Sequence, residues 1–204
     1  MSETKRMHQT FIVFLLLFCT INANRISLSG NDWMITDGKN ITAQGSVPGT
    51  VHTILLSAKK IPEPYYGHND VNLRSLVKRD WIFSKKFTLT RDFLVSNSIS
   101  IYLEQIDTVA NITINKCLIG RTANMFLRYV FSIPPACLRT KNIIQIDFQS
   151  PIIYALEQSI VYNVTLPPIC PPDCQHGECL VQFIRKEPCS FSWDWVRIDS
   201  VRHM

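Results

Sequence analysis

The residues best suited to chemistry lie near the end of the chain, where Trp193, Asp194 and Trp195 follow one another. Aromatic rings can cover the apolar C–H faces of a sugar, and a carboxylate accepts hydrogen bonds from its hydroxyls. On a strand, the two tryptophans would share one face and Asp194 would lie on the other. The pattern predicts a sugar-binding site. It is equally consistent with tryptophans packed in a core and Asp194 in a turn.

No other catalytic pattern is evident in the sequence. The five histidines include no pair at the spacing that holds a metal on a helix, and the seven glycines form no phosphate-binding loop. Arg185, Lys186 and Glu187, just before the tryptophans, are more typical of a charged turn than of a substrate clamp. The sequence therefore predicts no metal site and no cofactor.

The first 23 residues predict a secretory signal peptide. Lys5 and Arg6 precede an apolar run at 11–18 that is too short to span a bilayer as an ordinary helix. A buried strand and an uncleaved anchor are the alternatives. Three N-glycosylation sequons agree with a secretory route, and they begin at Asn40, Asn111 and Asn163. Asn111 is the weakest of these, because it lies inside an apolar strand pattern.

Cysteine usage also favours an oxidising compartment. Six cysteines follow the predicted signal peptide: Cys117, Cys137, Cys170, Cys174, Cys179 and Cys189. Six cysteines allow 15 pairings, and sequence alone does not choose among them. The last four could hold a metal together with His176, but disulfides are favoured in such a compartment. We expect a Cys170–Cys179 bridge that closes the loop 167–177.

Length and charge limit the classes of function. The chain has 204 residues, of which 46% are hydrophobic, and a net charge of +5. This suits a single domain over residues 24–204. The basic residues are scattered, with no run long enough to follow a phosphate backbone, so we expect no nucleic-acid partner. We also expect a monomer with no membrane contact after signal cleavage.

Strand patterns dominate the chain. Apolar and polar residues alternate over the ranges 81–89, 99–103, 110–114, 129–133 and 144–148. Because the connections between them are short and polar, the pattern predicts an all-β fold, an antiparallel β-sandwich of the jelly-roll type. One short helix is expected near residues 50–60, capped by Thr50 and ended by Pro62.

Several segments, taken in order, resemble the β-mannosidases of glycoside hydrolase family two, in particular the lysosomal enzymes of animals. They are 47–52, 65–70, 81–87, 106–112, the stretch from Asn124 to Tyr129, and 185–187 leading into Trp193–Trp195. The ordered set covers nearly all of the predicted mature chain, which makes it more specific than one short motif.

The resemblance implies a galactose-binding-domain-like jelly roll at the N-terminus of a longer enzyme. In that family a later (β/α)₈ barrel supplies two glutamates, an acid/base and a nucleophile, for retaining hydrolysis. The substrate implied is terminal, non-reducing β-linked mannose on glycoprotein-derived oligosaccharides, and the location implied is the lysosome. By the same match, Trp193, Asp194 and Trp195 bind the mannose, with Asp194 accepting hydrogen bonds from its hydroxyls.

Two departures from the family pattern bear on activity. Trp195 runs directly into Val196, where the family has a Gly-Pro turn and a loop, and the sequence ends at Met204 without a barrel. Retaining hydrolysis needs two carboxyl groups ~5 Å apart, which one binding aspartate does not supply. We therefore expect this chain alone to be inactive. The alternatives are a secreted carbohydrate-binding module without catalysis and a structural remnant without a ligand.

Overall fold

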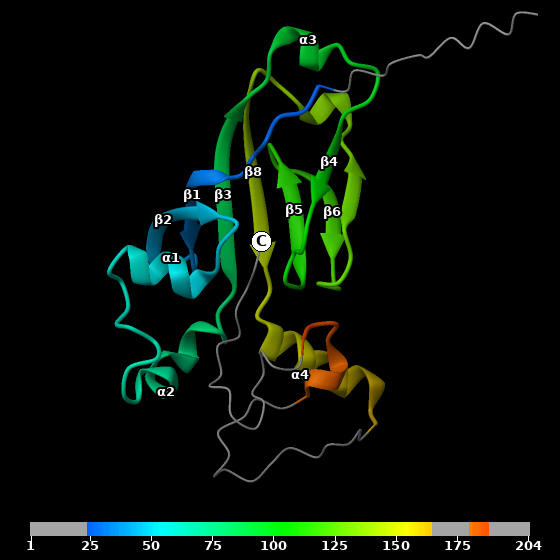
Figure 1. Cartoon of the computed structure of the whole chain (residues 1–204). Helices are drawn as coiled ribbons and strands as arrows, with labels where there is room; N and C mark the ends of the chain where they lie inside the picture. The colour runs from blue at the N-terminus through cyan, green and yellow to red at the C-terminus, as the bar shows by residue number, and fades with distance from the viewer. Residues whose placement is uncertain (1–23, 165–179, 188–204) are drawn as a thin grey trace, which may run out of the picture.

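The computed structural model describes residues 24–164 and 180–187. Its main element is a six-stranded antiparallel sheet in the order β2-β1-β3-β8-β5-β6 (Figure 1). The strands of this sheet are β1 (Gly30–Thr36), β2 (Thr42–Val47), β3 (Trp81–Thr88), β5 (Ala110–Ile114), β6 (Cys117–Thr122) and β8 (Lys141–Phe148). The central strands β3 and β8 pair along their whole length.

A smaller sheet packs against the large one and closes the core. It consists of β4 (Ser100–Leu103) and β7 (Tyr129–Ser132), which pair antiparallel. Inward-facing side chains of both sheets form a single apolar cluster, in which the Phe83 and Phe148 rings meet edge to face with centroids 5.3 Å apart. The layered antiparallel sheets confirm the predicted all-β sandwich class.

Lys85 interrupts the apolar alternation of β3 and still faces inward. Its side chain is 9% exposed, and its Nζ donates to Asp32 Oδ1 at 2.6 Å and to the Ser29 carbonyl at 3.3 Å. The hydrogen bond from Lys85 lowers the pKa of Asp32. Because a buried charge needs a partner, these contacts let β3 keep its register with a lysine on the core face.

The predicted helix near residues 50–60 is present as α1 (Val51–Ser57). Thr50 caps it as expected: the Thr53 amide donates to Thr50 Oγ1 at 3.0 Å, and the Thr50 amide donates to Thr53 Oγ1 at 2.9 Å. Val51, Ile54 and Leu55 are buried on one face, which packs the helix beside β2. The helix ends three residues before Lys60.

The structure adds further short helices to the one predicted. They are α2 (Asn69–Leu73), η1 (Arg74–Leu76), α3 (Arg91–Leu94), η2 (Pro135–Cys137), α4 (Pro151–Tyr162) and η4 (Val181–Phe183). The longest, α4, begins with Ser150 as its cap and Pro151 in its first turn. Its apolar residues lie on exposed as well as buried faces, which hides the helical period in the sequence. No helix in the described part of the chain is long and apolar enough to span a membrane.

Candidate functional site

The predicted sugar-binding residues Trp193, Asp194 and Trp195 lie outside the described residues, but the segment that leads into them is described. Residues 180–187 lie beside α4 at one end of the large sheet, where η4 is drawn in orange (Figure 1). Apolar side chains of this segment, Leu180, Val181, Phe183 and Ile184, pack with Ala155 of α4. The segment is therefore part of the folded domain as far as Glu187.

Residues 185–187 run alongside the connection between β6 and β7. Arg185 forms a parallel bridge with Asn124, and the Met125 amide donates to the Arg185 carbonyl at 3.0 Å. The Glu187 amide lies 3.1 Å from the Met125 sulfur and donates to it. These contacts bring together two of the segments that the sequence singled out, 124–129 and 185–187.

A buried ion pair joins the same segment to the start of β5. Lys186 Nζ donates to Asp107 Oδ2, and both side chains are 0% exposed. The Thr108 hydroxyl donates to the other carboxylate oxygen, Asp107 Oδ1. A charged turn was expected here, but Lys186 points into the protein, where its pairing with Asp107 offsets the cost of burying its charge.

On the exposed side of residues 185–187, a cation of this segment lies beside an aromatic ring of the β6–β7 connection. Phe126 is 60% exposed, and the Arg185 guanidinium lies 5.9 Å from the centroid of its ring. The Phe126 amide donates to Asn124 Oδ1 at 2.9 Å, and the Asn124 amide donates to the Tyr129 hydroxyl at 2.9 Å, which fixes the turn that carries the ring. An exposed ring beside hydrogen-bond donors is a surface on which a sugar can stack.

A second aromatic pair lies in the loop before α2. Tyr65 and Tyr66 are both well exposed, and their loop is tied down by Asn69, whose Nδ2 donates to the Glu63 carbonyl at 2.8 Å. Figure 1 places α2 and α4 at the same end of the large sheet. Exposed aromatic side chains from separate loops therefore occur at the end where the tryptophan-bearing segment begins.

Polar contacts of the turn between β1 and β2 hold the large sheet at the end where α2 and α4 lie. Asp37 in the β1–β2 turn accepts hydrogen bonds from three backbone amides and from Arg79 Nη1, the last at 2.7 Å. Burial raises the pKa of Asp37, but the amides of Ile41 and Lys39, Arg79 and the Asn40 amide together lower it to about 2. The carboxylate is therefore charged at any mildly acidic pH.

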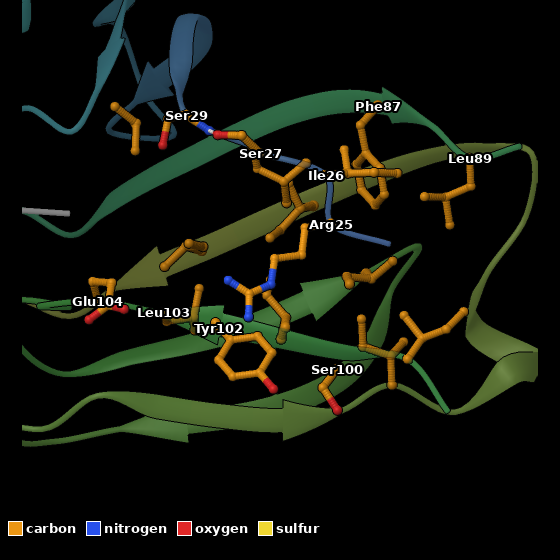
Figure 2. A pocket seen from close by; sticks show the side chains of 18 of the residues that line it. Arg25, Ile26, Ser27, Ser29, Phe87, Leu89, Ser100, Tyr102, Leu103 and Glu104 are labelled. Carbon is orange, nitrogen blue, oxygen red and sulfur yellow. Dashed lines mark hydrogen bonds between the residues drawn. The ribbon is translucent and has the colours of Figure 1, made fainter. Parts of the chain in front are cut away.

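A hollow lies between the two sheets. It has a volume of about 850 Å³ and is lined by the N-terminal segment 24–29, by β4 and by core residues that include Ile144 and Ile146 of β8. Figure 2 shows Arg25 and Tyr102 among the side chains that surround it. At its rim Glu104 and Arg128 form an ion pair at 2.9 Å. Its lining combines apolar core side chains with polar residues that include Ser27, Ser29 and Ser100.

Neither a metal site nor the expected Cys170–Cys179 bridge is found among residues 24–164 and 180–187. No group of three or more possible metal ligands occurs in those ranges. Cys170 and Cys179 lie outside them, so that bridge stays a prediction. A different pair, Cys117 and Cys137, forms a disulfide with Cα atoms 5.9 Å apart, joining the start of β6 to η2.

The three sequon asparagines are all exposed. Asn40 lies in the turn between β1 and β2, Asn111 points outward from β5, and Asn163 ends α4 in the left-handed conformation with φ 48°. Although Asn111 lies in a strand, the alternation of that strand turns it away from the core. Exposure is what attachment of a glycan requires.

Sequence reasoning missed Asp107 and Phe126 as members of this region. Nothing in one sequence pairs Asp107 with Lys186, which lies 79 positions away. Both missed residues nevertheless fall inside segments that the family resemblance singled out, 106–112 and 124–129. That resemblance was the one signal that could have found them.

Comparison with known proteins settles the family. Residues 33–201 match the family of glycosyl hydrolase 2 galactose-binding domain-like proteins. The chain belongs to this family. The β-mannosidase of Capra hircus is 44% identical over 172 residues, which cover 83% of this chain and 19% of that protein. The β-mannosidase of Mus musculus is 37% identical over 194 residues, covering 93% and 22%.

Solved structures of other proteins share the fold. A β-D-mannosidase from Dictyoglomus thermophilum superposes with a TM-score of 0.75 at 29% identity, covering 87% of this chain and 21% of that one. An exo-chitosanase from Amycolatopsis orientalis has a TM-score of 0.52 at 14% identity, which shows likeness of fold alone. The chain spans about one fifth of the length of the relatives it matches.

Proposed function

We propose that this chain is the N-terminal domain of a β-mannosidase and that it supplies substrate-binding residues but not the catalytic carboxylates. Three kinds of observation support this: the family match over residues 33–201, the identity to animal β-mannosidases, and the coverage of about one fifth of those enzymes. The remaining four fifths would hold the (β/α)₈ barrel with the acid/base and the nucleophile of a retaining hydrolase.

The observation that carries the proposal is the fixed position of residues 185–187. Lys186 is buried against Asp107, Arg185 lies over the exposed Phe126 ring, and Trp193 follows Glu187 by six positions in the sequence. The domain therefore holds Glu187, six positions before Trp193, at one defined place. A loop that helps to bind a substrate needs such an anchor, because ordering the loop only on binding would cost affinity.

The separate roles of this domain and of the barrel follow from the chemistry of their side chains. Trp193 and Trp195 would cover apolar faces of a terminal β-linked mannose, and Asp194 would accept hydrogen bonds from its hydroxyls. A single carboxylate used for binding does not also supply the acid and the nucleophile, which retaining enzymes hold ~5 Å apart. The domain thus orients the sugar, and the bond is broken by groups on the barrel.

The route through the cell forms part of the proposal. Residues 1–23 would be removed as a signal peptide, leaving residues 24–204 as a domain destined for the lysosome, where glycoprotein-derived oligosaccharides are degraded. The exposure of Asn40, Asn111 and Asn163 supports glycosylation on the secretory route. The proposed substrate is a soluble oligosaccharide, and the unit acting on it is a monomer.

A fusion tests the proposal. Residues 33–195 of this chain replace the matching part of the Capra hircus β-mannosidase, and hydrolysis of a chromogenic β-mannoside is measured beside that of a β-glucoside. We expect the fusion to prefer the β-mannoside and the same enzyme without an N-terminal domain to lose this activity. A folded fusion with no β-mannoside turnover would argue against the proposal.

A further inference from the structure

We propose that the buried Asp107–Lys186 ion pair is a positioning element for the segment that follows Lys186. The inference rests on the proposed function, because it takes Trp193, Asp194 and Trp195 as the residues that bind the sugar. Neither member of the pair needs to contact the sugar. Each acts through the chain segment that the pair holds.

Three consecutive residues ahead of the predicted site are each held by a different contact. The Arg185 carbonyl accepts the Met125 amide at 3.0 Å, the Lys186 ammonium is paired with Asp107, and the Glu187 amide donates to Met125 Sδ at 3.1 Å. The contacts come from two separate parts of the fold, the turn before β5 and the connection between β6 and β7. A segment held in this way has both a fixed position and a fixed direction.

A positioning role explains why a charged pair occupies this place. Burial of a charge costs several kcal/mol per ion, and apolar residues of similar volume in place of such a pair often leave stability unchanged or raise it. An apolar pair would not fix one register, whereas this carboxylate does. Its second oxygen accepts the Thr108 hydroxyl, and the Thr108 carbonyl accepts Thr122 Oγ1 of β6 at 2.9 Å.

The number of residues between Glu187 and Trp193 limits the distance between the ion pair and the predicted site. Trp193 follows Glu187 by six positions, and six extended residues span at most about 20 Å. The pair therefore limits how far from Glu187 the candidate sugar contacts can lie. A slip of residues 185–187 by one position would shift the residues after Glu187 by about 3.3 Å and turn alternate side chains to the opposite face.

The test removes both charges of the pair together, so that neither is left buried without the other. Asp107→Leu is combined with Lys186→Met in the full chain, labelled with ¹⁵N-tryptophan. The chain has four tryptophans; in the core, the Trp33 and Trp81 indoles donate to Leu28 O at 2.8 Å and Leu76 O at 3.0 Å. We expect the double variant to shift the indole signals of Trp193 and Trp195 and to leave Trp81 and the melting temperature unchanged.

Lys85→Met is the matched control. It removes another buried lysine, but one whose partner Asp32 is 55% exposed and stays solvated. We expect it to leave the Trp193 and Trp195 signals in place. Unchanged Trp193 and Trp195 signals in the double variant would overturn the inference. A shift of all four indoles with a lower melting temperature would overturn it too, since that marks a general loss of structure.

The fusion separates this inference from the proposed function. In an active fusion the double variant should lower kcat/KM by about 100-fold, mainly by raising KM. Small misplacements of binding groups have effects of this size. An active fusion that the double variant leaves unchanged refutes the positioning role. An inactive parent fusion, with the selective indole shift still seen in the chain, refutes the proposed function and leaves the positioning of the segment standing.

Discussion

The Phe131 ring of β7 fills the space beside Gly120 of β6 where any other side chain would begin. A Cβ atom on Gly120 would lie 2.4–2.6 Å from three carbon atoms of that ring. The ring also stacks on Tyr129, with centroids 5.8 Å apart. The small sheet therefore packs against the large one where β6 lacks a side chain, and this contact sets how β7 packs.

Gly120→Ala should destabilise the domain. The added methyl group would force the Phe131 ring to move, and overpacking of this kind costs about 1–3 kcal/mol. Urea unfolding of the variant beside the parent chain measures the difference. Adding Phe131→Leu to Gly120→Ala should recover part of the loss. An unchanged unfolding midpoint for Gly120→Ala alone would show that the sheets do not meet as described.

Removal of the Cys117–Cys137 disulfide should also destabilise the domain. The two cysteines lie 20 positions apart, and closing a loop of this size contributes about 3 kcal/mol. We expect Cys117→Ala with Cys137→Ala to lower the free energy of unfolding by about that amount. Substitution is preferable to a reducing agent, which would act on every disulfide of the chain. Equal stability of the double variant and the parent would contradict the bond.

Stability should depend on pH through Asp37. Its pKa is lowered from 3.8 to about 2 in the folded protein. Because the folded pKa lies below the unfolded one, the carboxylate stabilises the fold above pH 3.8 and this contribution is lost as the pH falls toward about 2. We expect Asp37→Asn to be less stable than the parent at pH 6 and to match it near pH 2. A difference in unfolding free energy between the variant and the parent that stays constant from pH 6 to pH 2 would rule out the charge of Asp37 as its cause.

The chain by itself should not hydrolyse a β-mannoside, because the proposal leaves both catalytic carboxyl groups to the barrel. The assay is release of the chromophore by the purified 204-residue chain. Turnover above that of a heat-denatured sample would contradict the expectation. Calorimetry with mannose adds a second comparison, in which millimolar or tighter binding would favour a free-standing carbohydrate-binding module. Thermal unfolding adds a third, in which absence of a cooperative melt would favour a structural remnant.

Strands β3, β4, β5, β7 and β8 could be predicted from the sequence because their side chains alternate, whereas β1, β2 and β6 were missed. The ranges 81–89, 110–114 and 144–148 correspond closely to β3, β5 and β8. The α4 helix was not predictable in the same way, since apolar residues such as Ile153 and Ile160 lie on its exposed side. Local pattern reveals an element only when one of its faces is polar.

The candidate site was less predictable than the fold. Trp193–Trp195 could be named from residue types and the resemblance, but the anchor before them depends on a contact between Asp107 and Lys186, 79 positions apart. A lysine in a run of charged residues is usually solvated, so nothing in the sequence marks Lys186 as buried. Contacts of this kind become visible only once the fold brings distant segments together.

The role of this domain in binding the sugar is tested most directly by Asp194→Ala in the fusion with the Capra hircus β-mannosidase. Hydrogen bonds to a charged group contribute about 1.5–3 kcal/mol, so kcat/KM for a β-mannoside should fall by about 10- to 100-fold. The melting temperature should not change. A fusion whose kcat/KM is the same with and without Asp194 would contradict the account.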